Sequence, residues 1–308
     1  MNTEAETYEV AIVGGGAAGL SAALVLGRAR RRVVVIDSGH PRNAPAAHMQ
    51  GFLSRDGMPP GELLEAGRAE VRRYGVELVA DRVLDAFPGF SLRLESGRVV
   101  EAAQVLLATG AGDVLPEGIE GVRERWGRDF LHCPYCHGWE VRDRPVGVLG
   151  SVEHAHLLRQ WTDDVTLFTH TTEVVDAERA VLAARGITVV DGIVERLVIA
   201  EDRLQGVQLA GGRLVAREAI FIRPTLRANL DNPAALLGCE LREDGLVHTG
   251  PDGRTSVPGV WAAGNAANPR AQVITAAGEG SAVAIAINTQ LVNEDVAAAV
   301  QLAVTTTA

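Results

Sequence analysis

The feature that most constrains this chain is a glycine-rich turn between an apolar run and a helical stretch. Residues 8–13 (YEVAIV) predict a buried strand, residues 14–19 (GGGAAG) form the turn, and residues 20–30 are rich in Ala and Leu at helical density. The next apolar run ends in Asp37, 18 residues after Gly19. A strand, a glycine turn, a helix and a strand that ends in an acid predict a βαβ unit that binds a dinucleotide.

Each element of this pattern has a physical role in such a unit. Gly14 allows the tight turn, Gly16 lets a pyrophosphate approach the backbone, and Gly19 lets the helix pack closely on the strand. Asp37 is placed to bind a ribose hydroxyl. On these residues alone, an ordinary glycine-rich turn without a ligand remains the alternative.

The rest of the chain repeats this plan. We expect a helix over 62–74 and an antiparallel meander at 76–83, 91–95 and 99–104, which leads into Val105–Gly110. Residues 111–129 are rich in turn and charged residues and are expected to be a linker. A second βαβ-like unit is expected over 145–168. Near the end of the sequence, we expect one more strand at 260–262 and a helix from about residue 272. Further strands are expected at 187–190, 194–199, 206–209 and 219–222. The sequence therefore predicts an α/β protein with two Rossmann-like nucleotide-binding domains.

Composition narrows the possible partners and mechanisms. The 308 residues are 47% apolar, enough for about two domains with buried cores. A net charge of −10 argues against nucleic acid or an anionic membrane as a partner. All 29 basic residues are Arg, which excludes mechanisms that need a P-loop, Schiff-base or general-base lysine. With no basic leader segment and no apolar run long enough to span a membrane, we expect a soluble, cytoplasmic protein.

Two of the three cysteines form the sequence Cys133-Pro134-Tyr135-Cys136, flanked by His132 and His137. Two thiols at this spacing can form a reversible disulfide, and a neighbouring imidazole can transfer a proton or stabilise a thiolate. Three interpretations remain beside a redox dithiol: haem attachment, which needs export; zinc, for which only Cys239 is left as a further thiol; and a structural pair of thiols. The redox interpretation fits the reduced compartment best, and we expect no metal site.

Thiol exchange moves two electrons, and a flavin is the natural relay for them. The turn at Gly14–Gly19, the Ala108-Thr109-Gly110 junction, the Cys133–Cys136 pair, and Ala263-Gly264-Asn265 followed by Gln272 together resemble the low-molecular-weight thioredoxin reductase family over nearly the whole chain. The segment CPYCHGWE is similar to the dithiol oxidase branch of gliotoxin- and holomycin-type enzymes, which close the disulfide of small dithiol metabolites.

The resemblance implies an FAD-binding domain formed by residues 1–114 and 234–308, with an inserted NAD(P)H-domain-like module of residues 115–233 that carries the dithiol. It implies a homodimer, and it assigns substrate exchange to Cys133, the flavin-facing thiol to Cys136, and acid–base work to His137, where the reductases have Asp. The FAD site residues expected on the same basis are Gly14, Gly16, Ala18, Gly19, Asp37, Arg42, His48, Val83, Thr109, Gly110, Gly264, Asn265 and Gln272.

The middle module departs from the reductases where they bind NADPH. Its turn, residues 150–154, reads GSVEH, so only the first glycine is kept and Glu153 places a negative charge where phosphates would lie. Where the reductases carry adjacent arginines for the 2′-phosphate, this chain has His170-Thr171. NADPH binding is therefore doubtful. The alternative is that another arginine reaches the phosphate, from among Arg159, Arg179 and Arg185.

These departures favour electron flow from substrate to flavin. We expect a small-molecule dithiol to attack the Cys133–Cys136 disulfide and leave as an intramolecular disulfide, with O2 reoxidising the flavin to give H2O2. The alternatives are a reductase of thioredoxin or of a small disulfide, fed by NADPH or ferredoxin, and a flavin-bearing redox sensor.

Overall fold

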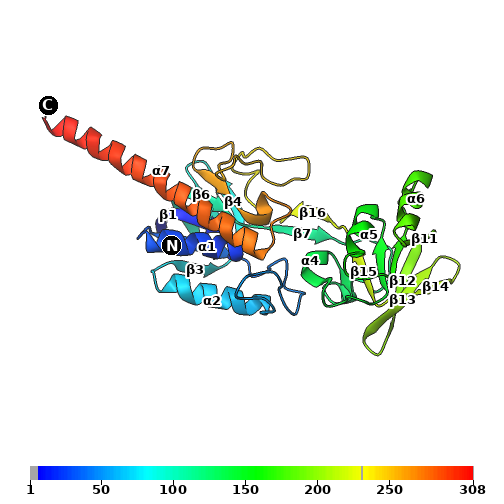
Figure 1. Cartoon of the computed structure of the whole chain (residues 1–308). Helices are drawn as coiled ribbons and strands as arrows, with labels where there is room; N and C mark the ends of the chain where they lie inside the picture. The colour runs from blue at the N-terminus through cyan, green and yellow to red at the C-terminus, as the bar shows by residue number, and fades with distance from the viewer. Residues whose placement is uncertain (1–5, 230–231, 308) are drawn as a thin grey trace. The chain divides into compact units, whose positions relative to one another are not determined.

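The computed structural model describes residues 6–229 and 232–307, and its internal contacts divide the chain into two units (Figure 1). The first unit comprises Met1–Arg42, Gly61–Gly112 and Leu226–Ala308, and the second comprises Asn43–Pro60 and Asp113–Thr225. Residues 43–60 thus group with the inserted unit. Pro45, in this segment, packs against Gly127, where an added Cβ would lie 2.9 Å from the Cβ of Pro45.

A mostly parallel sheet forms the centre of the first unit. Its strands follow the order β3-β2-β1-β6-β5-β4, and β17 pairs with β6. β4, β5 and the start of β6 pair antiparallel, whereas the other pairs in this sheet are parallel. The strands are β1 (Glu6–Val13), β2 (Val33–Asp37), β3 (Glu77–Ala80), β4 (Val83–Phe87), β5 (Ser91–Leu94), β6 (Val99–Leu107) and β17 (Val260–Ala262). The helices are α1 (Ala17–Arg28), α2 (Pro60–Arg72), α7 (Val273–Thr307) and the 3-10 helix η1 (Gly264–Ala266).

The central strands are apolar on both faces because both faces of this sheet are covered. In β1, Val10 and Ile12 join one core cluster with residues of α1 and α7, while Ala11 and Val13 join a second cluster on the opposite face. Continuous apolar runs, which the sequence shows at residues 10–13 and 33–36, are what such a strand requires.

The prediction of one meander strand over 76–83 is wrong. β3 pairs in parallel with β2, and a separate strand, β4, begins at Val83. The break lies at Asp81, whose backbone N–H donates to the Asp37 carbonyl and whose side chain accepts the N–H of Arg82 at 2.7 Å. The expected linker also contains regular structure, namely β7 (Ala111–Val114) and α3 (Val122–Arg125). β7 pairs with β16 (Thr225–Ala228), so the two stretches of chain that join the units form a small sheet.

The second unit is built on a parallel sheet in the order β11-β10-β9-β15-β8. A three-stranded antiparallel sheet, β12-β13-β14, contains the strands that the sequence predicts at 194–199 and 206–209. The strands are β8 (Phe130–Leu131), β9 (Val146–Leu149), β10 (Val165–Phe168), β11 (Thr188–Val190), β12 (Val194–Ala200), β13 (Arg203–Leu209), β14 (Leu214–Ala216) and β15 (Ala219–Ile222). The remaining helices are α4 (Pro134–His137), α5 (Val152–Leu158) and α6 (Asp176–Ala184).

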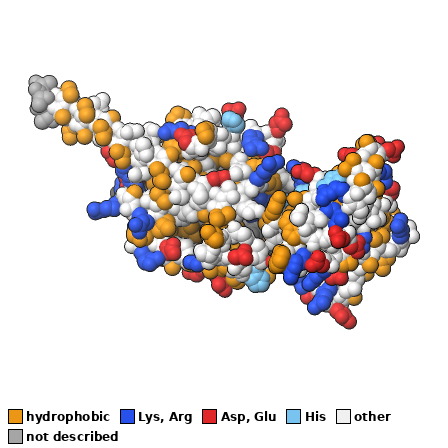
Figure 2. Space-filling model, in the orientation of Figure 1, with side chains coloured by type: hydrophobic (Ala, Val, Ile, Leu, Met, Phe, Trp, Pro, Cys, Tyr) orange, Lys and Arg blue, Asp and Glu red, His pale blue; other side chains and the backbone are white. Residues whose placement is uncertain are grey.

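The helix α7 has two different halves. Its first half packs on α1, where Gly280 lies so close that an added Cβ would be 2.0 Å from the carbonyl oxygen of Ala18. Residues 292–305 are all exposed, and Figure 2 shows hydrophobic side chains gathered along this end of the helix. Among the described residues, no helix is both long and apolar enough to cross a membrane.

Candidate functional site

The glycine turn of the first unit is built as the sequence predicts. Gly14 has a φ of +106°, a conformation that residues with a side chain rarely adopt, and an added Cβ would lie 2.3 Å from the Ala108 carbonyl oxygen. A Cβ at Gly19 would lie 1.9 Å from the Gly14 carbonyl oxygen. Gly16 differs, because a Cβ there would meet no atom of the described chain within 4 Å. The turn is therefore closely packed at Gly14 and Gly19 and open at Gly16, at the N-terminus of α1.

Groups around this opening are suited to a dinucleotide. The N-terminus of α1 carries no side-chain cap in the described structure, so its first N–H groups are available to an anion such as a pyrophosphate. Thr109 follows β6 beside the turn, and its buried hydroxyl has no hydrogen-bond partner among the described residues. Buried hydroxyls are normally paired, so this one fits a bound ligand group.

Asp37 ends β2 at the same edge of the sheet. An added Cβ at Gly15 would lie 2.6 Å from Asp37 Oδ2, so this carboxylate borders the turn directly. Arg68 Nη2 donates to Asp37 Oδ2 at 3.1 Å, and the Gly39 N–H donates to Oδ1 at 3.3 Å. These two donors fix the carboxylate, while each of its oxygens keeps a lone pair for a ribose hydroxyl.

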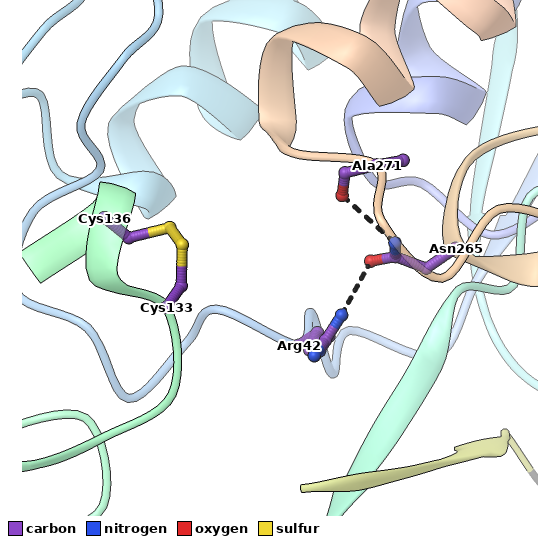
Figure 3. The surroundings of a disulfide bond; sticks show 5 residues. All are labelled: Arg42, Cys133, Cys136, Asn265 and Ala271. Atoms are coloured by element: carbon purple, nitrogen blue, oxygen red, sulfur yellow. Dashed lines mark hydrogen bonds between the residues drawn. A yellow bond between two sulfur atoms is a disulfide. The ribbon is translucent and has the colours of Figure 1, made fainter. Parts of the chain in front are cut away.

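The C-terminal segment brings Gly264 and Asn265 to α1. A Cβ at Gly264 would lie 3.1 Å from the Cβ of Ala18. Arg42 Nη1 donates to Asn265 Oδ1 at 3.2 Å, and Asn265 Nδ2 donates to the carbonyl oxygen of Ala271 at 3.0 Å (Figure 3). Asn265 Nδ2 also donates to the carbonyl oxygen of Asn268 at 2.9 Å. The amide of Asn265 is thus held by its own loop, which fixes its orientation.

The positions of the other predicted FAD residues give less information about a ligand. Val83 begins β4 and is buried in the core cluster with Val34 and Ile36. Gln272 directly precedes α7, and its carbonyl accepts the Ala276 N–H at 2.8 Å. His48 is exposed and lies in the segment 43–60, which groups with the second unit. Gly110 follows Thr109 with a φ of +69°.

Two residues of this site were not predicted from the sequence. Asn229 Nδ2 donates to the Thr109 carbonyl at 2.6 Å. Glu279, on α7, accepts the Gly264 N–H at 2.9 Å and the Asn268 side-chain amide at 2.6 Å. Asn229 is 120 positions from its partner, so no local pattern signals its role, whereas Glu279 could have been found as an acid on the first turns of the final helix.

In the second unit, Cys133 and Cys136 form a disulfide (Figure 3), with Cα atoms 5.2 Å apart. The bond spans the short helix α4: Cys133 is its N-cap residue, and the Cys133 carbonyl accepts the N–H groups of Cys136 and His137. Both cysteines are half-buried. Cys239 is a buried free thiol in the first unit, where burial raises its pKa, in keeping with a packing role.

His137 is the last residue of α4 and is half-buried. Burial lowers the pKa of its imidazole, and the nearby charge of Glu140 opposes that effect only partly. The ring is therefore neutral at pH 7 and can accept a proton from a thiol.

In the second unit, the turn at residues 150–154 is filled by side chains of the chain itself. Gly150 keeps a φ of +65°, but the Ser151 hydroxyl caps α5 by accepting the His154 N–H at 3.3 Å. Glu153 forms an ion pair with Arg223. The N-terminus of α5 is thus capped, unlike that of α1, and carries a carboxylate that an incoming phosphate would have to face.

The expected 2′-phosphate region offers no free cation among the residues concerned. His170 follows β10, and its Nδ1 accepts the Val194 N–H at 3.1 Å. The three arginines weighed as substitutes are engaged elsewhere. Arg179 forms a bidentate pair with Asp191, Arg159 donates to the Arg185 carbonyl at 2.7 Å, and Arg185 donates to the His156 carbonyl at 2.8 Å.

Comparisons with known proteins agree with this construction. A family model described as pyridine nucleotide-disulphide oxidoreductase matches residues 8–280. Thioredoxin reductase sirT from Leptosphaeria maculans is 33% identical, over 97% of this chain and 98% of that protein. Thioredoxin reductase tcpT from Claviceps purpurea is 34% identical, over 82% and 85%. The crystal structure of HlmI is 54% identical with a TM-score of 0.93, over 98% of both chains. The expected α/β fold and the resemblance to thioredoxin reductases are confirmed.

Proposed function

Because the chain belongs to the pyridine nucleotide-disulphide oxidoreductase family, we propose that it is an FAD-dependent dithiol oxidase, which closes an intramolecular disulfide in a small-molecule dithiol. FAD is the cofactor. The open turn at Gly16, the uncapped N-terminus of α1, Asp37 and the Thr109 hydroxyl are the groups that would hold it. The observation that carries the proposal is the pairing of a redox dithiol with a nucleotide turn closed by Ser151 and Glu153.

The exchange needs two steps at the disulfide. One thiolate of the substrate attacks Cys133 Sγ, the bond to Cys136 breaks, and Cys136 leaves as a thiolate. The second substrate thiolate then attacks the substrate sulfur of the mixed disulfide, which forms the intramolecular disulfide and releases Cys133 as a thiolate. His137, neutral because burial lowers its pKa, accepts a proton from an attacking thiol.

FAD, held at the turn beside Gly16 and Asp37, would supply a two-electron acceptor for the reduced dithiol and a site at which O2 is reduced to H2O2. The protein itself keeps Cys133 and Cys136 close enough for their disulfide to form again. The backbone of α4 holds the two residues together, because the Cys136 N–H donates to the Cys133 carbonyl at 3.1 Å.

A disulfide reductase is the second candidate, because two similar proteins are named thioredoxin reductases. Such an enzyme needs NADPH or another reductant to supply the electrons. Loss of two charge-assisted contacts, each about 1.5–3 kcal/mol, weakens NADPH binding by roughly 10²- to 10⁴-fold. The carboxylate of Glu153 adds repulsion.

One experiment separates the two functions. Purified holoenzyme is mixed without oxygen with either dithiothreitol or NADPH, and the visible absorbance of the flavin is followed; O2 uptake is then measured with a panel of dithiols in air. We expect dithiothreitol to bleach the flavin, NADPH to leave it oxidised, and one O2 to be consumed per dithiol. Rapid bleaching by NADPH without bleaching by dithiols would refute the oxidase.

We also propose a homodimer, supported by the exposed half of α7. Val292, Val296 and Val300 recur every four residues, so they lie along one face of the helix, and each is more than 40% exposed. Residues 296–307 include no charged side chain, so two copies can pair along them without charge repulsion. Light scattering on Val296→Glu should report a smaller mass than the unmodified protein, and an unchanged dimer would contradict this surface.

A further inference from the structure

The dithiol and the remodelled turn meet at one edge of the second sheet. β8, β15 and β9 are neighbouring parallel strands, with Leu131 opposite Phe221, and Ile222 opposite Leu149. The carboxyl ends of parallel strands lie at the same edge. The segments that follow these strands, which begin at His132, Arg223 and Gly150, are therefore brought together.

His154 links two of these segments. Its ring stacks on the ring of His132, the residue directly before Cys133, with centroids 6.4 Å apart. The backbone of His132 also acts on this imidazole as a hydrogen-bonding group that raises its pKa. On the other side, its Nδ1 lies 3.3 Å from Ser151 Oγ. One half-buried imidazole thus connects the cap of α5 to the start of the dithiol segment.

The neutral imidazole has the right number of groups for these partners. It carries one N–H donor and one acceptor nitrogen. When Nδ1 accepts the Ser151 hydroxyl, the N–H is on Nε2 and is available to the backbone of His132. Burial and the charge of Arg223 lower the pKa of His154 and favour this neutral form, against the opposing effect of Glu153.

We propose that His154 is a positioning residue for the dithiol: it holds the backbone at His132 so that Cys133 Sγ is presented to the attacking thiolate. The side chains that close the nucleotide turn thereby acquire a second task, which is to support thiol exchange. This inference rests on the proposed function in so far as exchange with a small dithiol is the reaction that benefits. His154 itself need not touch the substrate.

The matched control is His156, two residues further along α5. It is also half-buried, but its Nδ1 has no hydrogen-bond partner in the described structure. His154→Leu and His156→Leu each remove an imidazole from the same helix, so a difference between them reports the contacts that only His154 makes, with His132 and Ser151. His154→Gln retains a side-chain N–H donor and tests rescue.

The experiment measures exchange without relying on turnover. Each holoenzyme is mixed anaerobically with dithiothreitol, quenched with an alkylating reagent at set times, and the alkylated Cys133 and Cys136 are counted by mass spectrometry. FAD content and thermal stability are recorded for every variant. We expect reduction in His154→Leu to slow at least tenfold, His156→Leu to match the unmodified protein, and His154→Gln to recover most of the rate.

The outcomes distinguish the two proposals. Equal rates in His154→Leu and the unmodified protein, or equal slowing in both Leu variants, would overturn the positioning role alone. An unmodified disulfide that does not react with dithiothreitol would overturn the proposed oxidase and this inference with it. If His154→Leu does not fold, Ser151→Ala decides instead, because it removes the hydroxyl that lies 3.3 Å from His154 Nδ1. An unmodified exchange rate in Ser151→Ala refutes the positioning role, and a slower rate supports it.

Discussion

Replacing Gly280 by Ala should destabilise the first unit, although Ala is the better helix former. An added Cβ would lie 2.0 Å from the carbonyl oxygen of Ala18, and a Cβ less than 3.0 Å from another atom forces one of the two to move. That oxygen belongs to the backbone of α1, so the two helices must separate rather than one side chain rotate. Overpacking of this kind costs about 3 kcal/mol, offset by about 1 kcal/mol of helix propensity.

The net loss of about 2 kcal/mol corresponds to a fall of roughly 4–8 °C in the melting temperature for a unit of this size. Gly278→Ala is the matched control, since a Cβ there would meet no described atom within 4 Å. It should gain up to about 1 kcal/mol. Because Ala18 also borders the FAD turn, Gly280→Ala should retain less FAD. Melting is followed by circular dichroism and cofactor release by flavin fluorescence. If Gly280→Ala melted as high as Gly278→Ala, the close crossing would be refuted.

Three further predictions concern the site. Cys133→Ser should keep its FAD but lose dithiol turnover, as measured by O2 uptake; residual turnover above a tenth of the unmodified rate would exclude Cys133 as the exchanging thiol. Thr109→Val should leave the apoprotein as stable or up to about 1 kcal/mol more stable, because it removes an unpaired buried hydroxyl, while FAD binding weakens; isothermal titration that found unchanged affinity would argue against a hydroxyl contact. Burial lowers the folded-state pKa of three imidazoles below the unfolded value of about 6.5, so the unfolded chain binds protons first and the free energy of unfolding should fall as pH drops from 7 to 5. The three imidazoles are those of His137, His154 and His170. A free energy of unfolding, measured with urea, that stayed constant between pH 7 and pH 5 would contradict this prediction.

The local parts of the fold could be predicted from the sequence. A parallel strand buried on both faces is continuously apolar, and a dinucleotide turn needs glycine at fixed offsets, so β1, α1 and β2 are encoded within 32 residues, from Glu6 to Asp37. The same holds for the dithiol, whose chemistry depends on two residues three positions apart.

Other parts depend on pairing partners that are far away in the chain. β8 has only two residues, too few for any periodicity, and exists because Phe130 and Leu131 pair with β15. The ring contact of His154 with His132 follows from that pairing and has no local signature. Asn229 likewise reaches Thr109 only through the folded arrangement of the first unit.

The first unit is assembled from segments at both ends of the chain, and this has a consequence for biosynthesis. Gly19 leaves the ribosome more than 250 residues before Gly280, which at about 5–20 residues per second is a delay on the order of tens of seconds. Until Gly264 and α7 reach α1, the FAD site of the nascent chain is incomplete and an apolar strand is exposed. Cofactor binding must therefore wait until Gly264 and α7 have been synthesised, and cells short of flavin should accumulate this protein as protease-sensitive apoprotein.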